Sequence, residues 1–415
     1  MRALFCCRPA ACNANRPLAA WVFGLLFLAS CVAIPAIISE AQQKQKLPKP
    51  RQIDKEITWT RNPASGELES PSGEKTTNED SSVASAAHLH VVGRVYVRLV
   101  PVTCSAFGAD GVALRDLTAN DFRVFDDGTA KEISFFHAPS AEPAGVALVI
   151  DASPSVLRDA KEMKDSPRAL MDVLSREDQV AVVDFSAHTY LQLGFSNDRD
   201  LLSRAVARVD VRSLLSDVGG SNIYQAVYLT ARELFAQDRR HSRNAIVLFT
   251  DGQDSGLGLT LDPASTASHS GAFADRLTFE DVMRTLAGED IQTFVISTEN
   301  RPKIMTAQWL AAHRDTTLAT ADARKSGIPA YTLYLAEMAR RSGGEIYFLH
   351  EAQSLAETFR RIAERVGAEY WLGFTPGATP DGAPQPGWHS LRVEVTGHPD
   401  ATVVHRTSYY VSAAQ

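Results

Sequence analysis

The chain has 415 residues, of which 45% are hydrophobic and 22% charged, and its formal net charge is −7. This composition is ordinary for a globular protein, and the length allows one large core together with smaller modules. The mild acidity, with neither half of the chain strongly basic, argues against a nucleic-acid-binding protein. Four of the five cysteines lie near the N-terminus, and only Cys104 falls in the expected folded part. The folded part therefore offers neither a disulfide framework nor a cysteine-based zinc site.

The first 41 residues are predicted to be a signal peptide or membrane anchor. Arginines precede an uncharged run, Leu18 to Ile38, which is about as long as one helical crossing of a bilayer. Three outcomes remain open: a retained anchor, cleavage after Ala41, or lipidation at Cys31, although the apolar residues that follow Cys31 argue against the last. Each outcome places the bulk of the chain outside the cytoplasm, in the cell envelope, the periplasm or the extracellular space.

Two segments separate this anchor from the main domain. Residues 42–87 are poor in apolar side chains and rich in Lys, Glu, Ser, Thr and Pro, so we expect a flexible linker. Residues 88–140 change to an alternation of apolar and polar positions, interrupted by turn signals such as Asp126-Asp127-Gly128. This alternation predicts a small antiparallel β module.

Residues 144–367 alternate continuous apolar runs with helical periodicity, which indicates an α/β fold. A mostly parallel, doubly wound sheet covered by helices on both faces produces this pattern. A further run, Tyr190–Phe195, is expected to be an antiparallel edge strand. The predicted main strands are Val146–Ile150, Val180–Phe185, Ala245–Phe249, Ile291–Ile296 and Ile346–Leu349, and the predicted helices are Val156–Leu174, Asn222–Ala236, Thr278–Leu286, Tyr331–Arg341 and Glu351–Val366.

The remaining segments are two polar insertions and the C-terminal tail. The insertions, roughly residues 253–276 and 299–329, are expected to be surface excursions without an assigned role. The tail, residues 368–415, returns to alternation in Tyr370–Phe374, Leu391–Val395 and Thr402–Val404. We expect these strands to pair with the β module at residues 88–140.

Three polar clusters fall where the predicted strands end or a helix begins. Asp151, Ser153 and Ser155 follow the first strand, Ser221 precedes the helix near Asn222, and Thr250-Asp251-Gly252 follows a later strand. Ligands of open α/β sheets bind at the carboxyl ends of the strands, so these groups should meet. Carboxylates and hydroxyls suit a hard cation: Mg²⁺, or Mn²⁺ or Ca²⁺. The alternative is that each cluster only caps a helix.

The motifs D-x-S-x-S, G-G-S and T-D-G resemble the metal-ion-dependent adhesion site of von Willebrand factor type A domains. The resemblance covers roughly Gly145 to Gly367. It implies that Ser153, Ser155 and Ser221 bind the metal directly, and that Asp151 and Asp251 act largely through bound waters. Ser221 stands where the family usually has threonine, and its hydroxyl preserves the ligand atom. The flanking segments Leu117–Val124 and Tyr370–Pro376 and the Ser408-Tyr409-Tyr410 end are also similar to a bacterial subgroup first described from acidobacteria.

The predicted function is that of a metal-dependent adhesion or scaffold module and not of an enzyme. The open position on the metal would accept a carboxylate from a protein partner, and the N-terminal segment would attach the chain to a membrane. A metal-dependent hydrolase or phosphatase is the first alternative, but position 153 is Ser where a phosphotransferase would need a second carboxylate. A metal-free structural envelope protein is the second.

Overall fold

The computed structural model describes residues 46–55, 60–61, 68–69, 99–139, 143–159, 170–209, 221–238, 241, 243–255, 277–313, 318, 325–349, 355–377 and 385–411. The chain divides into two compact units, Met1–Lys46 and Leu47–Gln415, and every element below belongs to the second. The predicted N-terminal anchor lies outside the described residues. None of the helices in the described ranges is long and apolar enough to cross a membrane.

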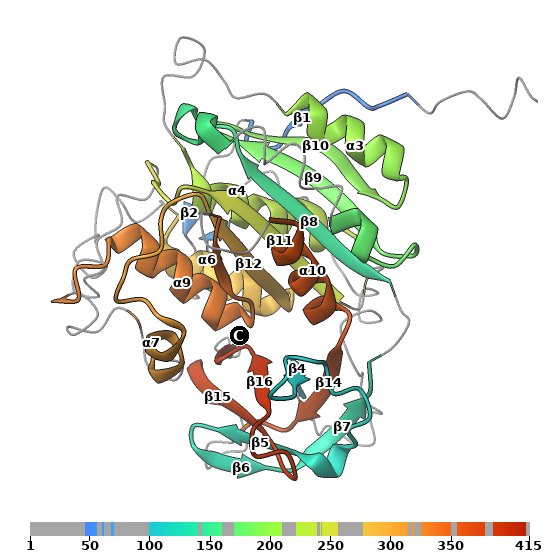
Figure 1. Ribbon diagram of the computed structural model, residues 1–415, viewed down its shortest axis with the longest axis vertical. Helices are drawn as coiled ribbons and strands as arrows, with labels where there is room; N and C mark the ends of the chain where they lie inside the picture. Colours follow the sequence, from blue (N-terminus) through green and yellow to red (C-terminus); the bar gives the residue numbers. More distant parts are fainter. Residues whose placement is uncertain are drawn as a thin grey trace, which may run out of the picture. The chain divides into compact units, whose positions relative to one another are not determined.

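The second unit is built around a seven-stranded mixed sheet, which confirms the predicted α/β class. The strand order is β1-β10-β9-β8-β11-β12-β13 (Figure 1). Strands β9, β8, β11, β12 and β13 run parallel to one another, β10 is antiparallel to β9, and β1 at the edge pairs antiparallel with β10. All eight residues of β8 are buried, as a strand covered on both faces requires. The bounds are β1 Arg51–Gln52, β8 Ala144–Asp151, β9 Gln179–Phe185, β10 Thr189–Ser196, β11 Arg243–Thr250, β12 Ile291–Ser297 and β13 Ile346–Phe348.

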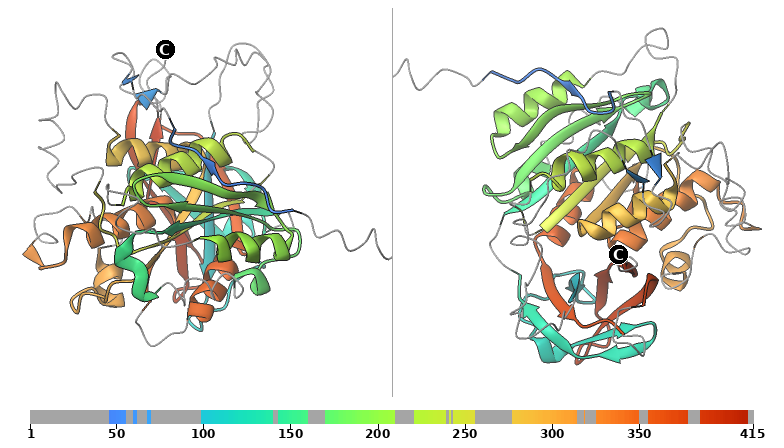
Figure 2. Two further views of the ribbon diagram at one scale, coloured as in Figure 1. Left: turned by 90° about the horizontal axis from the view of Figure 1, so that it is seen from above. Right: turned by 180° about the vertical axis from the view of Figure 1, so that it is seen from behind.

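Helices cover both faces of this sheet, each with its own hydrophobic core (Figures 1 and 2). One face carries α4 (Ile223–Thr230) with its π-helical continuation η3 (Ala231–Phe235), α6 (Phe279–Gly288) and α9 (Ala330–Ser342). The other face carries α3 (Arg199–Arg208) and α10 (Leu355–Val366).

Two shorter helical elements, η2 (Pro154–Asp159) and α7 (Ala307–Ala312), also belong to the described part of the domain, and α3 is a helix that the sequence analysis did not predict. The first predicted helix begins as η2, which is a 3-10 helix. The short helix α7 lies inside the second predicted insertion. Asp198 caps α3 by accepting hydrogen bonds from the backbone N–H groups of Asp200 and Leu201. That cap was the available sequence signal.

The segments before and after the main domain form two small antiparallel sheets that share one core. The tail does pair with the preceding β module, as predicted: β14 lies between β4 and β7, and β15 pairs with β5. The sheet orders are β16-β4-β14-β7 and β17-β15-β5-β6. Residues of both sheets are buried together, and Phe374 packs edge-on against Tyr409. The bounds are β4 Val100–Phe107, β5 Phe122–Asp126, β6 Thr129–Lys131, β7 Ile133–His137, β14 Glu369–Phe374, β15 Gly387–Val395, β16 Thr402–His405 and β17 Ser408–Val411. We call this part the β sandwich.

Some residues of the predicted flexible linker belong to the folded unit. β1 extends the main sheet by pairing with β10, and β2 (Thr60–Arg61) pairs with β3 (Leu68–Glu69). Ile53 and Leu68 are buried in the core of the α4 face. Arg61 forms a two-point contact with Asp281 of α6, at 3.0 and 2.7 Å. An edge strand has free backbone groups, and those of β10 pair with β1.

We predict that Gly344→Ala destabilises the protein strongly, because a Cβ there would lie 2.0 Å from the Thr293 carbonyl oxygen in the adjacent strand β12. Relief requires β12 and β13 to separate, and overpacking of this kind costs about 1–3 kcal/mol or more. The control is Gly194→Ala in β10, where no atom lies within 4 Å of the added Cβ. Urea unfolding of both variants measures the difference. Equal stabilities would contradict the β12–β13 packing.

Candidate functional site

The candidate site lies at the carboxyl ends of β8 and β11. These strands are parallel neighbours, and Ile150 is paired with Phe249, so the next residues, Asp151 and Thr250, stand side by side. The loop after β8 is held to the sheet because the N–H of Ala152 donates to the Phe185 carbonyl at 2.7 Å. The parallel register therefore produces the predicted meeting of the two loops.

The Asp151 carboxylate is buried and receives three hydrogen bonds. Its Oδ1 accepts from the N–H of Ser153 at 2.9 Å. Its Oδ2 accepts from the hydroxyls of Thr250 at 2.7 Å and Ser221 at 3.1 Å. Asp151 is 0% exposed. Three loops that are distant in sequence thus converge on one carboxylate.

Ser153 and Ser155 form a pair of hydroxyls beside this carboxylate. Their Oγ atoms are 2.9 Å apart, and either atom could be the donor. Ser153 is buried, whereas Ser155 is exposed at the end of the pair. The two hydroxyls of the D-x-S-x-S motif are therefore in contact, one on a buried residue and the other on an exposed one.

Ser221 and Asp251 come from the other two loops. Ser221 is fixed by Ser255, whose N–H donates to the Ser221 carbonyl at 2.7 Å. Asp251 is 3% exposed, and its Oδ1 accepts from the N–H of Gln253 at 2.9 Å. Its Oδ2 is buried and has no hydrogen-bond partner among the described residues. A buried carboxylate oxygen without a donor is costly unless a cation or water satisfies it.

The electrostatics of the site reflect two carboxylates close together in a buried place. Burial raises the pKa of Asp151 to about 6, with a further contribution from the charge of Asp251, while hydrogen bonds from Ser153 and Thr250 act in the opposite direction. The pKa of Tyr331 is also raised, first by burial and then by the negative charges of Glu299 and Asp251. The site therefore has a surplus of negative charge that a cation would neutralise.

All five predicted site residues thus belong to three converging loops, and Asp151, Ser221, Ser153 and Ser155 are linked by hydrogen bonds. The first two residues of the G-G-S motif lie outside the described residues. The predicted site did not include Thr250, which bonds Asp151 and also accepts from the N–H of Gly252 at 3.1 Å. The sequence signal that could have identified Thr250 was its position as the last residue of a strand, directly before the acidic residue Asp251. Gly252 has φ +90°, a conformation that favours glycine.

A family model for the von Willebrand factor type A domain matches residues 146–253, the segment that contains all three of these loops. The chain contains a von Willebrand factor type A domain. No curated protein matches the sequence. The bacterial subgroup expected from the flanking segments stays a prediction.

The solved structures that match the chain include two Bacteroides proteins and one protein from Catenulispora acidiphila. An aerotolerance-related membrane protein from Bacteroides fragilis shares 18% identity, with 54% of this chain and 98% of that chain covered and a TM-score of 0.35. BatB from Bacteroides thetaiotaomicron also shares 18%, with coverages of 53% and 98% and a TM-score of 0.36. A von Willebrand factor type A protein from Catenulispora acidiphila shares 14%, with coverages of 75% and 74% and a TM-score of 0.36.

A second group of acidic residues lies in the β sandwich, outside the type A domain. Carboxylate oxygens of Asp126 and Asp127 and a ring nitrogen of His389 lie within 4.8 Å of one another, as metal ligands would. Both ring nitrogens of His389 are engaged, Nδ1 with Asp127 and Nε2 with the Gln385 carbonyl, each at 2.8 Å. Burial lowers the pKa of His389, but these two bonds and the carboxylate charges raise it above its ordinary value. The group is a satisfied hydrogen-bond network.

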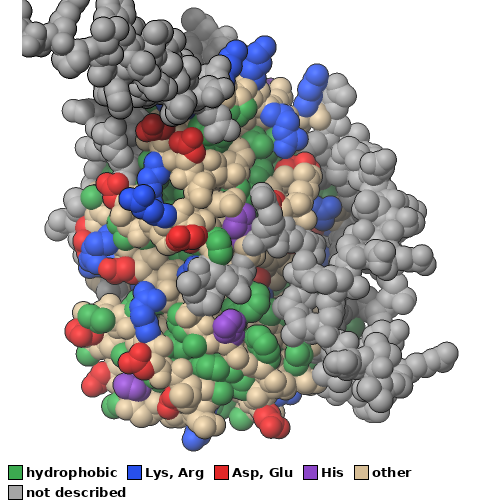
Figure 3. All heavy atoms as spheres, turned by 90° about the vertical axis from the view of Figure 1, so that its right-hand side faces the viewer, with side chains coloured by type: hydrophobic (Ala, Val, Ile, Leu, Met, Phe, Trp, Pro, Cys, Tyr) green, Lys and Arg blue, Asp and Glu red, His purple; other side chains and the backbone are tan. Residues whose placement is uncertain are grey.

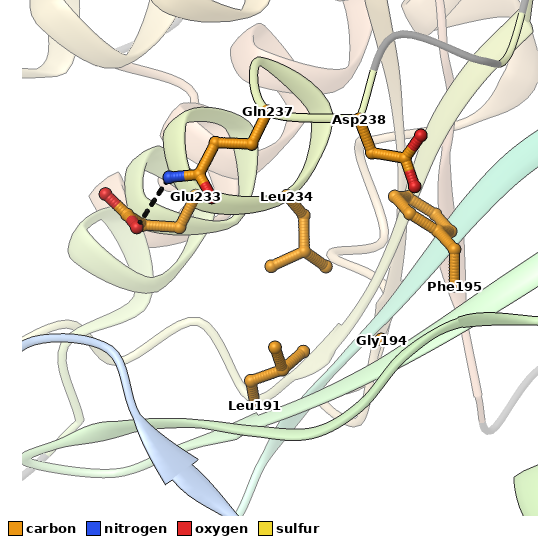
Figure 4. Close-up of a pocket in the computed structure, with 7 residues that line it drawn as sticks. All are labelled: Leu191, Gly194, Phe195, Glu233, Leu234, Gln237 and Asp238. Carbon is orange, nitrogen blue, oxygen red and sulfur yellow. Dashed lines mark hydrogen bonds between the residues drawn. The ribbon is translucent and has the colours of Figure 1, made fainter.

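The surface gives two further observations. A groove of about 440 Å³ is lined by residues of β10 and η3, and Figure 4 shows Leu191, Leu234 and Phe195 along it. In the sheet, β10 is separated from β8, the strand that ends at Asp151, by β9. On the described part of the face in Figure 3, basic and acidic side chains are interspersed.

We predict that Thr250→Val destabilises the type A domain by about 1–3 kcal/mol, because it removes a donor to Asp151 and the acceptor of the Gly252 N–H. The matched control is Thr230→Val in α4. Thr230 is equally buried, but its hydroxyl donates only to the Ala226 carbonyl one helical turn earlier. We expect the control to cost less than about 1 kcal/mol by urea unfolding. Equal losses would contradict a special role for Thr250.

Proposed function

We propose that the type A domain holds a divalent cation at the carboxyl edge of its sheet and uses it to bind a protein partner. Ser153, Ser155 and Ser221 would supply hydroxyl oxygens, and Asp151 and Asp251 would act largely through bound waters. The observation that carries the proposal is the Oδ2 atom of Asp251, which is buried, beside a second buried carboxylate, and without a donor among the described residues. A cation satisfies this oxygen and removes the repulsion between the carboxylates.

The proposed ligands determine which kind of cation the site would bind. They also leave the cation able to bind one more anionic ligand. The set contains only oxygen atoms, which favours Mg²⁺, with Mn²⁺ or Ca²⁺ as alternatives. Hydroxyls are neutral, so two carboxylates are the only negative charges among the proposed ligands. Ser155 is exposed and marks the side from which another ligand can approach. A carboxylate of a protein partner is the anionic group best suited to that position, and domains of this family often mediate metal-dependent protein interactions.

The proposed role is binding, carried out beyond the cytoplasm. Residues 1–41 would export the chain or anchor it to a membrane, so that the domain meets its partner in the cell envelope, the periplasm or the extracellular space. The hydrolase alternative needs a carboxylate at position 153, where the chain has Ser. Hydrolysis of p-nitrophenyl phosphate that requires Mg²⁺ and is lost in Asp151→Asn would contradict the binding role.

We predict that millimolar Mg²⁺ or Mn²⁺ raises the melting temperature of the folded part and that Asp151→Ala abolishes this shift. A cation present at 100 times its dissociation constant stabilises the native state by about 2.7 kcal/mol. The control is His389→Gln, which alters the other acidic group and should leave the metal-induced shift intact. Thermal unfolding with and without chelator measures all three proteins.

Two outcomes would contradict this prediction. The first is an unchanged melting curve in the wild type across millimolar metal, and the second is a shift that disappears in His389→Gln instead of Asp151→Ala. Asp251→Asn tests whether the effect of removing this charge on protein stability reverses when metal is added. In chelator it should be at least as stable as the wild type, because it removes one of two buried charges, and in metal it should be the less stable protein.

We also predict a metal-dependent partner with an essential carboxylate. The immobilised wild-type protein should retain a protein from cell-envelope extract in Mg²⁺ and release it in chelator. Asp151→Ala should retain none, and an extract whose carboxyl groups have been converted to amides should supply none. Retention that is equal in chelator, or equal after amidation, would contradict a carboxylate bound to the metal.

A further inference from the structure

The loop after β12 borders the proposed cation site on one side. β12 is the parallel neighbour of β11, and Ser297 at its carboxyl end is paired with Thr250. The N–H of the next residue, Thr298, donates to the Thr250 carbonyl at 3.0 Å. Glu299 therefore follows β12 at the same edge of the sheet where Asp251 follows β11.

Tyr331, at the start of α9, shows that these two acidic loops are close together. Its ring packs against the loop after β11, because a Cβ on Gly252 would lie 3.0 Å from the Tyr331 Cδ2 atom. Burial raises the pKa of Tyr331, and the negative charges of Glu299 and Asp251 both raise it further. One phenol is thus near the carboxylate of a proposed cation ligand and near that of Glu299.

Glu299 carries a charge that no other described group compensates. Its backbone N–H donates to the Ser297 hydroxyl at 3.3 Å, but its carboxylate forms no hydrogen bond or ion pair within the described part of the chain. The guanidinium carbon of Arg301, two residues later, lies over the Phe348 ring, 5.4 Å from the ring centre. Glu299 is half-buried, so part of the side chain remains accessible to a partner.

The cation and Glu299 together determine the charge that a partner meets. The two positive charges of a divalent cation balance the two negative charges of Asp151 and Asp251. Glu299 then remains as a negative charge beside the position that the partner's carboxylate would take. Like charges within about 10 Å repel even at physiological salt. A partner that offers only a carboxylate should therefore bind less well than one that also brings a positive charge.

We propose that Glu299 binds a basic side chain of the same partner whose carboxylate binds the cation. This role of Glu299 rests on the proposed cation-dependent binding, and it specifies the partner as a segment that carries an acidic and a basic residue close together. Arginine is favoured because its guanidinium group can bond both oxygens of one carboxylate. β12 lies two strands from β8, which is about 10 Å, and about three residues of extended chain span that distance.

The test selects peptides from a library of random dodecapeptides displayed on phage. The immobilised full-length protein binds the phage in millimolar Mg²⁺, and chelator releases them. Peptides released from the wild type should contain Asp or Glu, with Arg or Lys enriched about two to four residues away. Peptides selected on Glu299→Gln should keep the acidic residue and lose the enrichment of the basic one.

Glu233→Gln is the matched control. It removes the same charge from another half-buried glutamate of the type A domain, on η3, at the far end of the α4 helix from Ser221. Peptides selected on this variant should keep both the acidic and the basic residue. A rise in melting temperature on addition of Mg²⁺ verifies that Glu299→Gln is folded and still holds the cation.

Two kinds of failure are distinguishable. Acidic peptides without an enriched basic residue on the wild type, or the same enrichment on Glu299→Gln as on the wild type, would overturn the role of Glu299 and leave cation-dependent binding in place. A wild type that yields no acidic peptide released by chelator would contradict the proposed function, and the role of Glu299 with it.

One synthetic peptide from the wild-type selection measures the contact directly. Its affinity is compared with that of a version in which alanine replaces the basic residue, by fluorescence polarisation in Mg²⁺. The replacement should weaken binding to the wild type roughly fivefold, as for a partly exposed ion pair, and leave binding to Glu299→Gln nearly unchanged. Equal losses on the two proteins would overturn a contact between the basic residue and Glu299.

Discussion

The burial of the Asp151 carboxylate at the end of the central strand is the constraint on which the candidate site depends. A charged group taken out of water must be compensated, and here the compensation comes from the backbone of its own loop and from two hydroxyls. Those hydroxyls belong to loops that only the parallel pairing of β8 with β11 and the packing of α4 bring near. The charge of Asp151 therefore connects the sheet register to the geometry of the site.

The β sandwich lies at the amino ends of the parallel strands, because the chain enters and leaves the type A domain there. The chain passes from β7 into β8 and returns from α10 into β14, and β7 and β14 are neighbours in one sheet of the β sandwich. The amino ends of the parallel strands therefore adjoin the sandwich, where Arg243 at the start of β11 donates to the Val366 carbonyl at 2.8 Å. The carboxyl ends, with Asp151 and Ser155, lie at the opposite end of the strands, away from the sandwich.

The sequence predicts those features that are local or repeated, and it does so for a physical reason. Strands such as β8 and β11 are continuous apolar runs because both faces are covered, and the loops after them carry the acidic residues. The two-residue strand β1 has no periodicity to detect, and its place is set by the free edge of β10. Neither the direction of the Thr250 hydroxyl nor the missing donor at Asp251 can be inferred from residue types.

The two acidic groups of this protein show that proximity of carboxylates does not by itself indicate a metal site. In the β sandwich, Asp126 accepts from the Tyr409 hydroxyl and the Gly377 N–H, and Asp127 accepts from Ser390 and binds His389, so all four oxygens are satisfied. A cation there would have to displace existing donors. At the sheet edge, one oxygen of Asp251 has no donor among the described residues, although it is buried beside another carboxylate. The first arrangement is complete as a hydrogen-bond network, whereas the second contains an oxygen that a cation or a water would satisfy.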